Sequence, residues 1–365
     1  MSDTTRTSST AGRLTVFRQA LTAQHLDAAL IGTLTNIRYL TGFTGSAGYL
    51  VIGHHEATLY VDGRYTEQAT EQFTSGRVTT TVRDILGGVL ESLKGTVRAG
   101  ARLGFEAAAL PYDQWQRATD GLSGVELVPT ARLVETLRAR KDAAEVEAIR
   151  QAVVITDRAY EDLLTWIKPG MKESEVAARC EYFQRMHGGD RKETRTAVGS
   201  GPRSAMPHCI ATDRVIGPNE PVMLDLGCLV DGYTSDLTRT VWLGKPPEDF
   251  EAMHRAVGEA QRLATDAVRP GVAGRAIHEI ARNHLVRGGF PDLPHSLGHS
   301  LGLNIHERPS FSAVETEAIE VGNVITVEPG IYLSGRYGVR TEDIVVVTPD
   351  GCEVLSAREH VLQVR

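Results

Sequence analysis

The sequence predicts an α+β protein of two domains: a small α/β domain over residues 1–138 and a larger domain over residues 139–365 that contains an internal repeat. A chain of 365 residues exceeds the size at which one hydrophobic core usually stops growing. A charged stretch at 138–141, followed by a helix start, marks the predicted boundary. A series of helix ends and acid-bearing strands recurs about 100 residues later and indicates the repeat.

The composition is that of an ordinary globular protein and excludes several function classes. With a net charge of -7 and no dense run of Lys or Arg, no nucleic-acid partner is expected. The first ten residues are polar, and no apolar run reaches about 18 residues, so we expect a cytoplasmic protein with no membrane partner. Four widely spaced cysteines without a CxxC pair agree with a reducing compartment.

The first domain is predicted from short strand-like runs separated by glycines. Apolar runs at residues 28–31, 49–52 and 58–61 follow a helical pattern that begins at Leu14. This alternation is typical of a small α/β domain.

The second domain begins with a long amphipathic helix. Asp142 and Glu145 form an N-terminal capping pattern ahead of it, and Pro169-Gly170 ends it. Its predicted buried stripe comprises Val146, Ile149, Val153, Tyr160, Leu163 and Ile167.

The repeat is visible in the helix ends and in the acids that follow. Pro169-Gly170 and Gly188-Gly189 end two helices, and Pro270-Gly271 and Gly288-Gly289 end two more in the same order. Strands follow in each copy. In each, one apolar strand carries a single acid two residues before a glycine, and a second acid follows on the next strand. The two related halves would therefore each bring two carboxylates to a shared axis.

The first copy carries Asp225 within VMLDLG and Asp236 on the next strand. For a lone acid in a buried strand, an Asp satisfied by backbone amides or an arginine is the simpler interpretation. If Asp231-Gly232 forms a two-residue hairpin turn, residue 225 pairs with 238 and Asp236 becomes its diagonal neighbour on the same face. Two carboxylates would then repel each other in a low-dielectric interior unless a divalent metal binds both.

The second copy repeats this arrangement with Glu328 in ITVEPG and Glu342 in GVRTEDIVVV. Arg239 and Arg340 are the obvious basic neighbours, too few to neutralise four buried carboxylates. Two divalent ions would balance the charge. Oxygen-rich coordination with one imidazole favours manganese, with iron(II), cobalt or zinc as alternatives.

The imidazole is expected from PHSLGHSLGLNIHE, which holds His295, His299 and His306. A single histidine is more often structural than ligating, but three in a glycine-broken segment favour a site. Gly298 and Gly302 flank His299 and allow the backbone to approach an ion closely, while the other two histidines are expected at the rim. A two-metal site predicts hydrolysis. Phosphoester hydrolysis is the alternative, but no basic groove or phosphate-cradling loop accompanies the site.

At these residues the sequence resembles the pita-bread metallopeptidases, which include methionine aminopeptidase, prolidase and aminopeptidase P. The segments MPHCIAT, LDLG, YTSDLTRT, HSLGHSLGLNIHE, VEPGIY and VRTED fall in the family's order between about Thr194 and Asp343. The resemblance implies a pita-bread catalytic domain with a pseudo-two-fold repeat. One departure is Ser300, where many members have glycine after the ligating histidine.

The resemblance also implies a set of metal ligands. Asp236 and Glu342 would bridge two ions, Asp225 would bind one of them, and His299 with Glu328 would bind the other. Glu328 would also relay protons.

Further site residues are implied in the same way. His208 and His306 resemble histidines that position the scissile carbonyl and its developing oxyanion. His295 resembles the histidine beside the pocket for the residue after the cut. Arg340 resembles the site arginine, and Tyr332 of VEPGIY is expected to bind substrate.

The first half of the chain bears on the substrate. YLTGFTGSAGYLVI followed by LYVDGRYTEQA resembles the small bacterial aminopeptidase P. The resemblance implies an Xaa-Pro aminopeptidase, which releases the residue before a proline, and a homodimer. A closed, histidine-lined pocket would accept the pyrrolidine ring of the tertiary amide. Asp62 and Arg64 would either approach a neighbouring subunit's site or form a local ion pair, and neither interpretation is favoured.

Other functions are consistent with parts of the pattern. Prolidase, which cuts only Xaa-Pro dipeptides, is the nearest alternative. A non-catalytic binding module and a metal-free creatinase-type hydrolase share the fold, but five intact ligands argue against both. Cys209 could be imagined as a nucleophile with His208 as its base, yet neighbours on a strand point to opposite faces.

Overall fold

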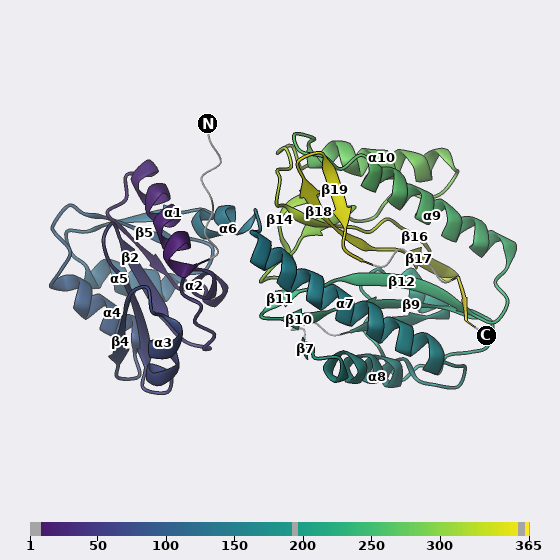
Figure 1. Cartoon of the computed structure of the whole chain (residues 1–365), viewed down its shortest axis with the longest axis horizontal. Helices are drawn as coiled ribbons and strands as arrows, with labels where there is room; N and C mark the ends of the chain where they lie inside the picture. Colours follow the sequence, from purple (N-terminus) through teal and green to yellow (C-terminus); the bar gives the residue numbers. More distant parts are fainter. Residues whose placement is uncertain (1–8, 192–195, 357–361, 365) are drawn as a thin grey trace. The chain divides into compact units, whose positions relative to one another are not determined.

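A computed structural model of the chain describes residues 9–191, 196–356 and 362–364. The chain falls into two compact units, Met1–Arg138 and Ala139–Arg365. Each unit has its own sheets, helices and buried core (Figure 1). The predicted α+β class, with an α/β first domain, is confirmed.

The first unit is built on a six-stranded mixed sheet of order β4-β3-β2-β1-β5-β6. The central strand β2 is antiparallel to both of its neighbours, β1 and β3, and the outer pairs are parallel. The fully buried Phe17, Ile37 and Leu59 belong to its core. Its elements are α1 (Thr10–Ala23), β1 (Ala28–Ile31), α2 (Leu34–Thr41), β2 (Tyr49–Gly53), β3 (Ala57–Asp62), α3 (Thr66–Gln72), β4 (Arg77–Thr81), α4 (Ile85–Lys94), β5 (Arg102–Glu106), α5 (Tyr112–Gly121), β6 (Glu126–Thr130) and α6 (Leu133–Arg138).

The second unit begins with a helix pair followed by strands. A four-stranded sheet of order β20-β12-β9-β8 packs against this pair, and a three-stranded sheet has the order β11-β10-β7. The elements are α7 (Ala143–Trp166), α8 (Glu173–Met186), β7 (Asp190–Arg191), β8 (Ala197–Ser200), the short 3₁₀ helix η1 (Gly201–Ala205), β9 (Glu220–Leu226), β10 (Cys228–Val230), β11 (Tyr233–Thr234), β12 (Leu237–Leu243) and β20 (Gln363–Val364).

The remainder of the second unit repeats this order. A second helix pair precedes a five-stranded sheet, β14-β13-β15-β18-β19, and a two-stranded sheet, β16-β17. Figure 1 shows the two helix pairs on opposite sides of the strands. The elements are α9 (Glu248–Asp266), α10 (Gly274–Arg287), β13 (Gly298–Ser300), β14 (Glu307–Phe311), β15 (Val324–Val327), β16 (Gly330–Leu333), β17 (Tyr337–Arg340), β18 (Asp343–Thr348) and β19 (Gly351–Val354).

The two halves share a hydrogen bond that lies just beyond the end of their first helices. Gly170 and Gly271 both adopt a left-handed backbone, with φ of 93° and 86°, which favours glycine. Their N–H groups donate to the carbonyls of Ile216 and Ile319 at 2.8 Å and 2.9 Å. The predicted repeat is therefore present in backbone geometry, although few side chains are shared.

The long helix α7 begins where the capping pattern predicts. Asp142 accepts hydrogen bonds from the backbone N–H groups of Ala144 and Glu145, and the Glu145 carboxylate accepts one from the N–H of Asp142. This reciprocal pair satisfies donors that a helix start otherwise leaves unpaired. The helix ends at Trp166, slightly before the predicted proline-glycine stop.

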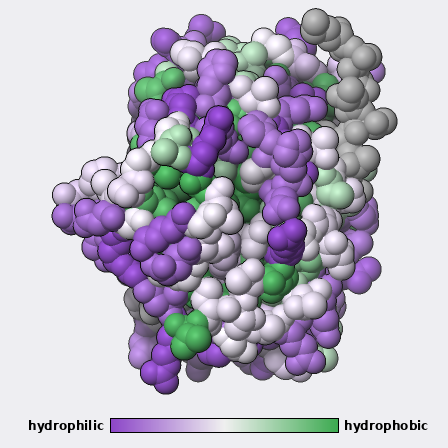
Figure 2. Space-filling model, turned by 90° about the vertical axis from the view of Figure 1, so that its left-hand side faces the viewer, coloured by the Kyte–Doolittle hydropathy of each residue, from purple (hydrophilic) through white to green (hydrophobic). Residues whose placement is uncertain are grey.

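The described residues show no sign of a membrane-spanning segment. Every described helix is too short or too polar to cross a lipid bilayer. On the face of the molecule in Figure 2, hydrophilic residues predominate and hydrophobic residues form only small groups.

We expect Asp142→Ala to lower the free energy of unfolding of the second unit by about 1 kcal/mol, because the helix loses its capping acceptor. Urea titration followed by far-ultraviolet circular dichroism measures this change. Asp142→Asn is the matched control, since its amide oxygen can still accept the same hydrogen bonds. Equal losses in the two variants would contradict a capping role.

Candidate metal centre

The hairpin that carries the first two acids has the predicted register. The turn between β10 and β11 places Asp231 and Gly232 at φ of 48° and 75°, as a two-residue hairpin turn requires. Asp225 pairs with Thr238 across β9 and β12. Asp236 follows β11 and lies two residues before Thr238. The predicted pairing is confirmed.

Four of the five expected ligands come together, three carboxylates around one imidazole. Single ligand atoms of Asp236, His299 and Glu342 all lie within 4.8 Å of one another. His299 Nε2 is 3.8 Å from Asp236 Oδ2 and 3.5 Å from Glu328 Oε1. Asp236 and Glu342 are only 7% and 2% exposed. Carboxylates from both halves of the repeat thus meet in a buried place.

The fifth expected ligand, Asp225, has an arginine partner. Arg340 Nη2 donates to Asp225 Oδ2 at 2.7 Å. The same guanidinium donates to Thr238, to the carbonyl of Pro207 and to the Tyr332 hydroxyl, at 3.0, 2.7 and 3.3 Å. Metal binding by Asp225 stays a prediction.

The second arginine that the sequence suggested as a neutralising partner serves another acid. Arg239 Nη2 lies 2.6 Å from Asp343 Oδ1, and Arg239 also donates to the backbone carbonyl of Glu342. The arginine therefore supports the backbone of Glu342 and leaves its side-chain charge uncompensated.

The carboxylates of the cluster are buried close together, an arrangement that a bound cation would stabilise. Burial, with the nearby charge of Asp236, raises the pKa of Glu328 to about 8 and that of Glu342 well above its usual range. Glu342 Oε2 accepts a hydrogen bond from Thr238 Oγ1 at 2.7 Å, whereas Glu342 Oε1 is buried with no hydrogen-bond partner among the described residues. A buried oxygen of this kind is costly unless something binds it. An acidic donor set with one imidazole fits divalent cations.

The remaining predicted residues surround the cluster at different depths. The His306 ring centroid is 4.3 Å from that of His299, and His306 is exposed. His295 Nε2 lies 2.9 Å from the Tyr332 hydroxyl, and burial lowers the pKa of His295 to about 4, so the ring is neutral at pH 7. His208 is exposed in the turn after η1.

The structure gives no support to a cysteine nucleophile. His208 and Cys209 lie in and directly after a turn, so the strand on which the sequence argument relied is wrong. Cys209 is buried, and this burial raises the pKa of its thiol to about 11. A thiol held neutral in this way is a poor nucleophile.

Two threonines of the site were missed from the sequence. Thr238 binds both Glu342 and Arg340, and Thr326 Oγ1 accepts from the His299 N–H at 3.1 Å and donates to Glu328 Oε1 at 3.4 Å. Each stands two residues from an acid on the same chain segment. Because side chains alternate along a strand, this spacing places threonine and acid on one face, a signal that was available.

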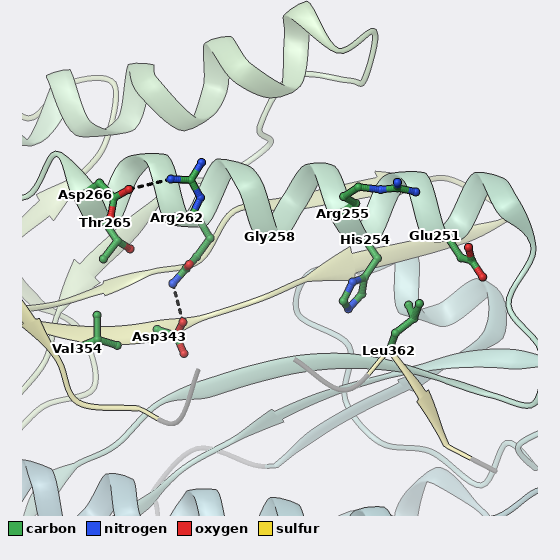
Figure 3. Close-up of a pocket in the computed structure, with 11 residues that line it drawn as sticks. Glu251, His254, Arg255, Gly258, Arg262, Thr265, Asp266, Asp343, Val354 and Leu362 are labelled. Atoms are coloured by element: carbon green, nitrogen blue, oxygen red, sulfur yellow. Dashed lines mark hydrogen bonds and ion pairs between the residues drawn. The ribbon is translucent and has the colours of Figure 1, made fainter. Parts of the chain in front are cut away.

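A cavity of about 640 Å³ lies beside α9 (Figure 3). None of the described residues that line it belongs to the ten predicted site residues. Gln261 Nε2 donates to Asp343 Oδ2 at 2.6 Å at its wall. The cavity therefore borders Asp343, the residue after Glu342, and its partner Gln261 rather than the carboxylate cluster.

In the first unit, Asp62 and Arg64 form the local ion pair. Arg64 Nη2 lies 2.7 Å from Asp62 Oδ2, and the Arg64 side chain is 71% exposed. An approach to a neighbouring subunit stays a prediction.

Comparison with known proteins matches the chain along nearly its whole length. The model of metallopeptidase family M24 matches residues 147–349, and that of the creatinase/prolidase N-terminal domain matches residues 13–140. An uncharacterized peptidase of Bacillus subtilis is 38% identical over 329 residues, which cover 89% of this chain and 92% of the relative.

Two solved structures are similar over the whole fold. An Xaa-Pro dipeptidase from Bacillus anthracis has a TM-score of 0.92 at 34% identity, covering 97% of this chain and 100% of that one. An X-Pro aminopeptidase from Thermotoga maritima has a TM-score of 0.90 at 31% identity, covering 97% and 99%.

We expect the melting temperature of the metal-free protein to fall as pH is raised from 5 to 8. The pKa of Glu328 is about 8 in the folded chain and near 4.5 ordinarily, so over this window the folded state holds a proton that the unfolded state has lost. Rising pH then favours the unfolded state. Thermal melts in EDTA measure this, and added Mn²⁺ should restore stability most at pH 8.

Glu328→Gln provides the control, because it cannot ionise and should weaken the pH dependence. A metal-free protein that becomes more stable between pH 5 and 8 would be inconsistent with a crowd of buried, proton-holding carboxylates.

Proposed function

The chain belongs to metallopeptidase family M24, and we propose that it is an Xaa-Pro aminopeptidase, which cleaves the peptide bond before a proline in second position. The proposal rests on one observation: the side chains of a histidine and three acids cluster in the interior of the second unit. These residues are Asp236, His299, Glu328 and Glu342. The contact of the neutral His295 ring with the Tyr332 hydroxyl supports the preference for proline.

In this proposal Asp225, Asp236, His299, Glu328 and Glu342 would hold two divalent ions. Manganese is the preferred ion. When bound, a pair of such ions supplies a hydroxide nucleophile at neutral pH and polarises the carbonyl under attack. The unpartnered Glu342 Oε1 supports its role as a shared ligand.

Glu328 is proposed to carry the proton. Its carboxyl is largely buried, and its other neighbours include Thr326, which donates to Oε1. Burial favours the neutral form of a carboxyl once it has accepted a proton. Glu328 would therefore take a proton from the attacking water and pass it to the leaving amine of proline.

The surrounding side chains would orient the peptide. His306, beside His299, and the exposed His208 would donate to the carbonyl oxygen as negative charge develops on it. The neutral His295 ring and Tyr332 would contact the apolar pyrrolidine ring. Arg340 would hold Asp225 and Tyr332 in place.

The engagement of Arg340 favours an aminopeptidase over a dipeptidase. A dipeptidase must hold the free carboxylate of its terminal proline, which calls for a cation at that side of the site. Arg340 is the one guanidinium among the ten predicted site residues, and it already donates to Asp225, Thr238, Pro207 and Tyr332.

A prolidase restricted to Xaa-Pro dipeptides is the second candidate. The name of the similar Bacillus anthracis structure, Xaa-Pro dipeptidase, favours it.

We also propose that the protein is a cytoplasmic homodimer. Light scattering of the purified chain would test the oligomeric state.

We expect an Xaa-Pro-Yaa tripeptide to be cleaved with a higher kcat/KM than the matching Xaa-Pro dipeptide in the presence of Mn²⁺. Free proline release and free N-terminal residue release are measured separately by chromatography. The same peptides with alanine in place of proline serve as controls and should be cleaved poorly. Exclusive cleavage of the dipeptide would replace the proposal by the prolidase candidate.

We expect His306→Ala to lower kcat by about 100-fold or more with little change in KM, because a donor to the developing oxyanion is lost. His306 is exposed, so the fold should persist. His284→Ala is the control: that histidine is on α10, 3.3 Å from Glu259 Oε2, away from the cluster. If only KM changes in the variant, His306 does not stabilise the transition state.

A further inference from the structure

The two histidines nearest the cluster are carried by a distorted strand pair. Ser300 of β13 pairs with Glu307 of β14, whereas the preceding residue, His299, pairs with Ser310. The register of the two strands therefore shifts between His299 and Ser300. Such an irregularity re-aims side chains and often lies beside active sites. The direction of the His299 ring therefore depends on how this strand pair is held.

The residues next to the two histidines bind a side chain that is not part of the cluster. Ser300 Oγ and Glu307 Oε2 both lie within hydrogen-bond distance of Lys141 Nζ. The two histidine rings instead contact each other, with centroids 4.3 Å apart. Ser300 and Glu307, paired across the ladder, thus form the rear face, on the Lys141 side, of the segment that presents the imidazoles.

A buried lysine binds both residues of this rear face. Lys141 Nζ donates to Ser300 Oγ at 2.9 Å and to Glu307 Oε2 at 3.2 Å. The Lys141 and Glu307 side chains are only 1% and 7% exposed. The other Glu307 oxygen accepts from the backbone N–H of Asn304 at 3.0 Å. The ammonium therefore fastens the beginning and the end of the loop that leads from His299 to His306.

The lysine is itself firmly anchored. Its backbone N–H donates to the carbonyl of Gly322 at 2.7 Å, in the turn before β15. Gly322 has a left-handed φ of 88°, and a Cβ there would come within 2.8 Å of the Lys141 carbonyl. Asp142, the next residue, caps α7. A fixed backbone makes the long lysine side chain a brace rather than a mobile charge.

There is little space around this contact. A Cβ at Gly302 would come within 3.0 Å of Glu307 Oε1 and 3.1 Å of Lys141 Cε. Glycine at this position therefore lets the lysine and the glutamate meet beneath the loop. The hydroxyl of Ser300 gives the brace an additional attachment directly beside His299.

We propose that Lys141 is a positioning residue that sets the orientation of His299 and His306 through Ser300 and Glu307. The inference rests on the proposed function, in which His299 binds a metal ion and His306 contacts the substrate. Removing a group that orients a ligand typically costs about 10- to 100-fold in metal affinity.

The test is calorimetric titration of Mn²⁺ into the metal-free full-length chain, compared with Lys141→Met. We expect the affinity of the variant to fall by about 10-fold or more at a temperature where circular dichroism shows both proteins folded. Arg150→Met is the matched control. It also replaces a paired cationic side chain by methionine, on α7, breaks the Arg150–Glu353 ion pair of 2.7 Å, and should bind Mn²⁺ like the unaltered chain.

The double variant Lys141→Met/Glu307→Gln separates positioning from charge balance. It removes the buried carboxylate charge that loses its lysine partner in the single variant, so it should be more stable. If the lysine positions His299, the double variant still binds Mn²⁺ weakly. Wild-type affinity in either folded variant would overturn the proposal.

The remaining outcomes also decide the matter. If Lys141→Met does not fold, the double variant and Ser300→Ala, which keeps the ion pair, give the same comparison, and unchanged affinity in both overturns the brace. If the unaltered chain binds no Mn²⁺, the proposed metal function fails and this inference fails with it. If it binds Mn²⁺ but cleaves only dipeptides, the aminopeptidase assignment fails while the affinity comparison still tests Lys141.

Discussion

Three carboxylates gathered around one imidazole in a buried place are the constraint on which the rest of the site depends. Asp236, Glu328 and Glu342 approach His299 from both halves of the second unit. Their mutual repulsion, together with burial, would leave the glutamates protonated in the absence of a cation. Cations that bind these oxygens would instead stabilise the charged forms. The repulsion between carboxylates, which destabilises the metal-free protein, would be relieved when cations bind and would thus favour their binding.

The repeated architecture explains how such a crowd can be assembled. Each half supplies a helix pair and an antiparallel strand pair, and the acids stand at or near the ends of those strands. Packing of each strand layer against its helices gives a rigid scaffold. Threonines on the same strands bind the carboxylates, and Arg239 supports the Glu342 segment from behind. The site is therefore fixed by regular elements rather than by loops alone.

Much of this arrangement could be predicted because it depends on local rules. Asp231-Gly232 specifies its turn type, the turn specifies the register, and the register brings Asp225 opposite Thr238. The capping residues of α7 follow equally local chemistry. The repeat was recoverable because glycines with left-handed backbones recur at matching places.

The rest required contacts between distant segments. No spacing rule joins Arg340 to Asp225, or Lys141 to Ser300 and Glu307, since these partners are more than a hundred residues apart in the chain. Arg239 was expected among the neutralising partners of the four acids, yet it binds Asp343, one position beyond Glu342. The side chain of the adjacent residue faces away along a strand, and only the folded packing shows which acid an arginine meets.

The most direct measurement is an anomalous-scattering map from crystals of the full-length chain grown with Mn²⁺. The account predicts two adjacent peaks, both in contact with carboxylate oxygens of Asp236 and Glu342, with His299 on one of them. A map without peaks at these carboxylates, in a protein that is fully folded, would contradict the claim that cations make this cluster tolerable.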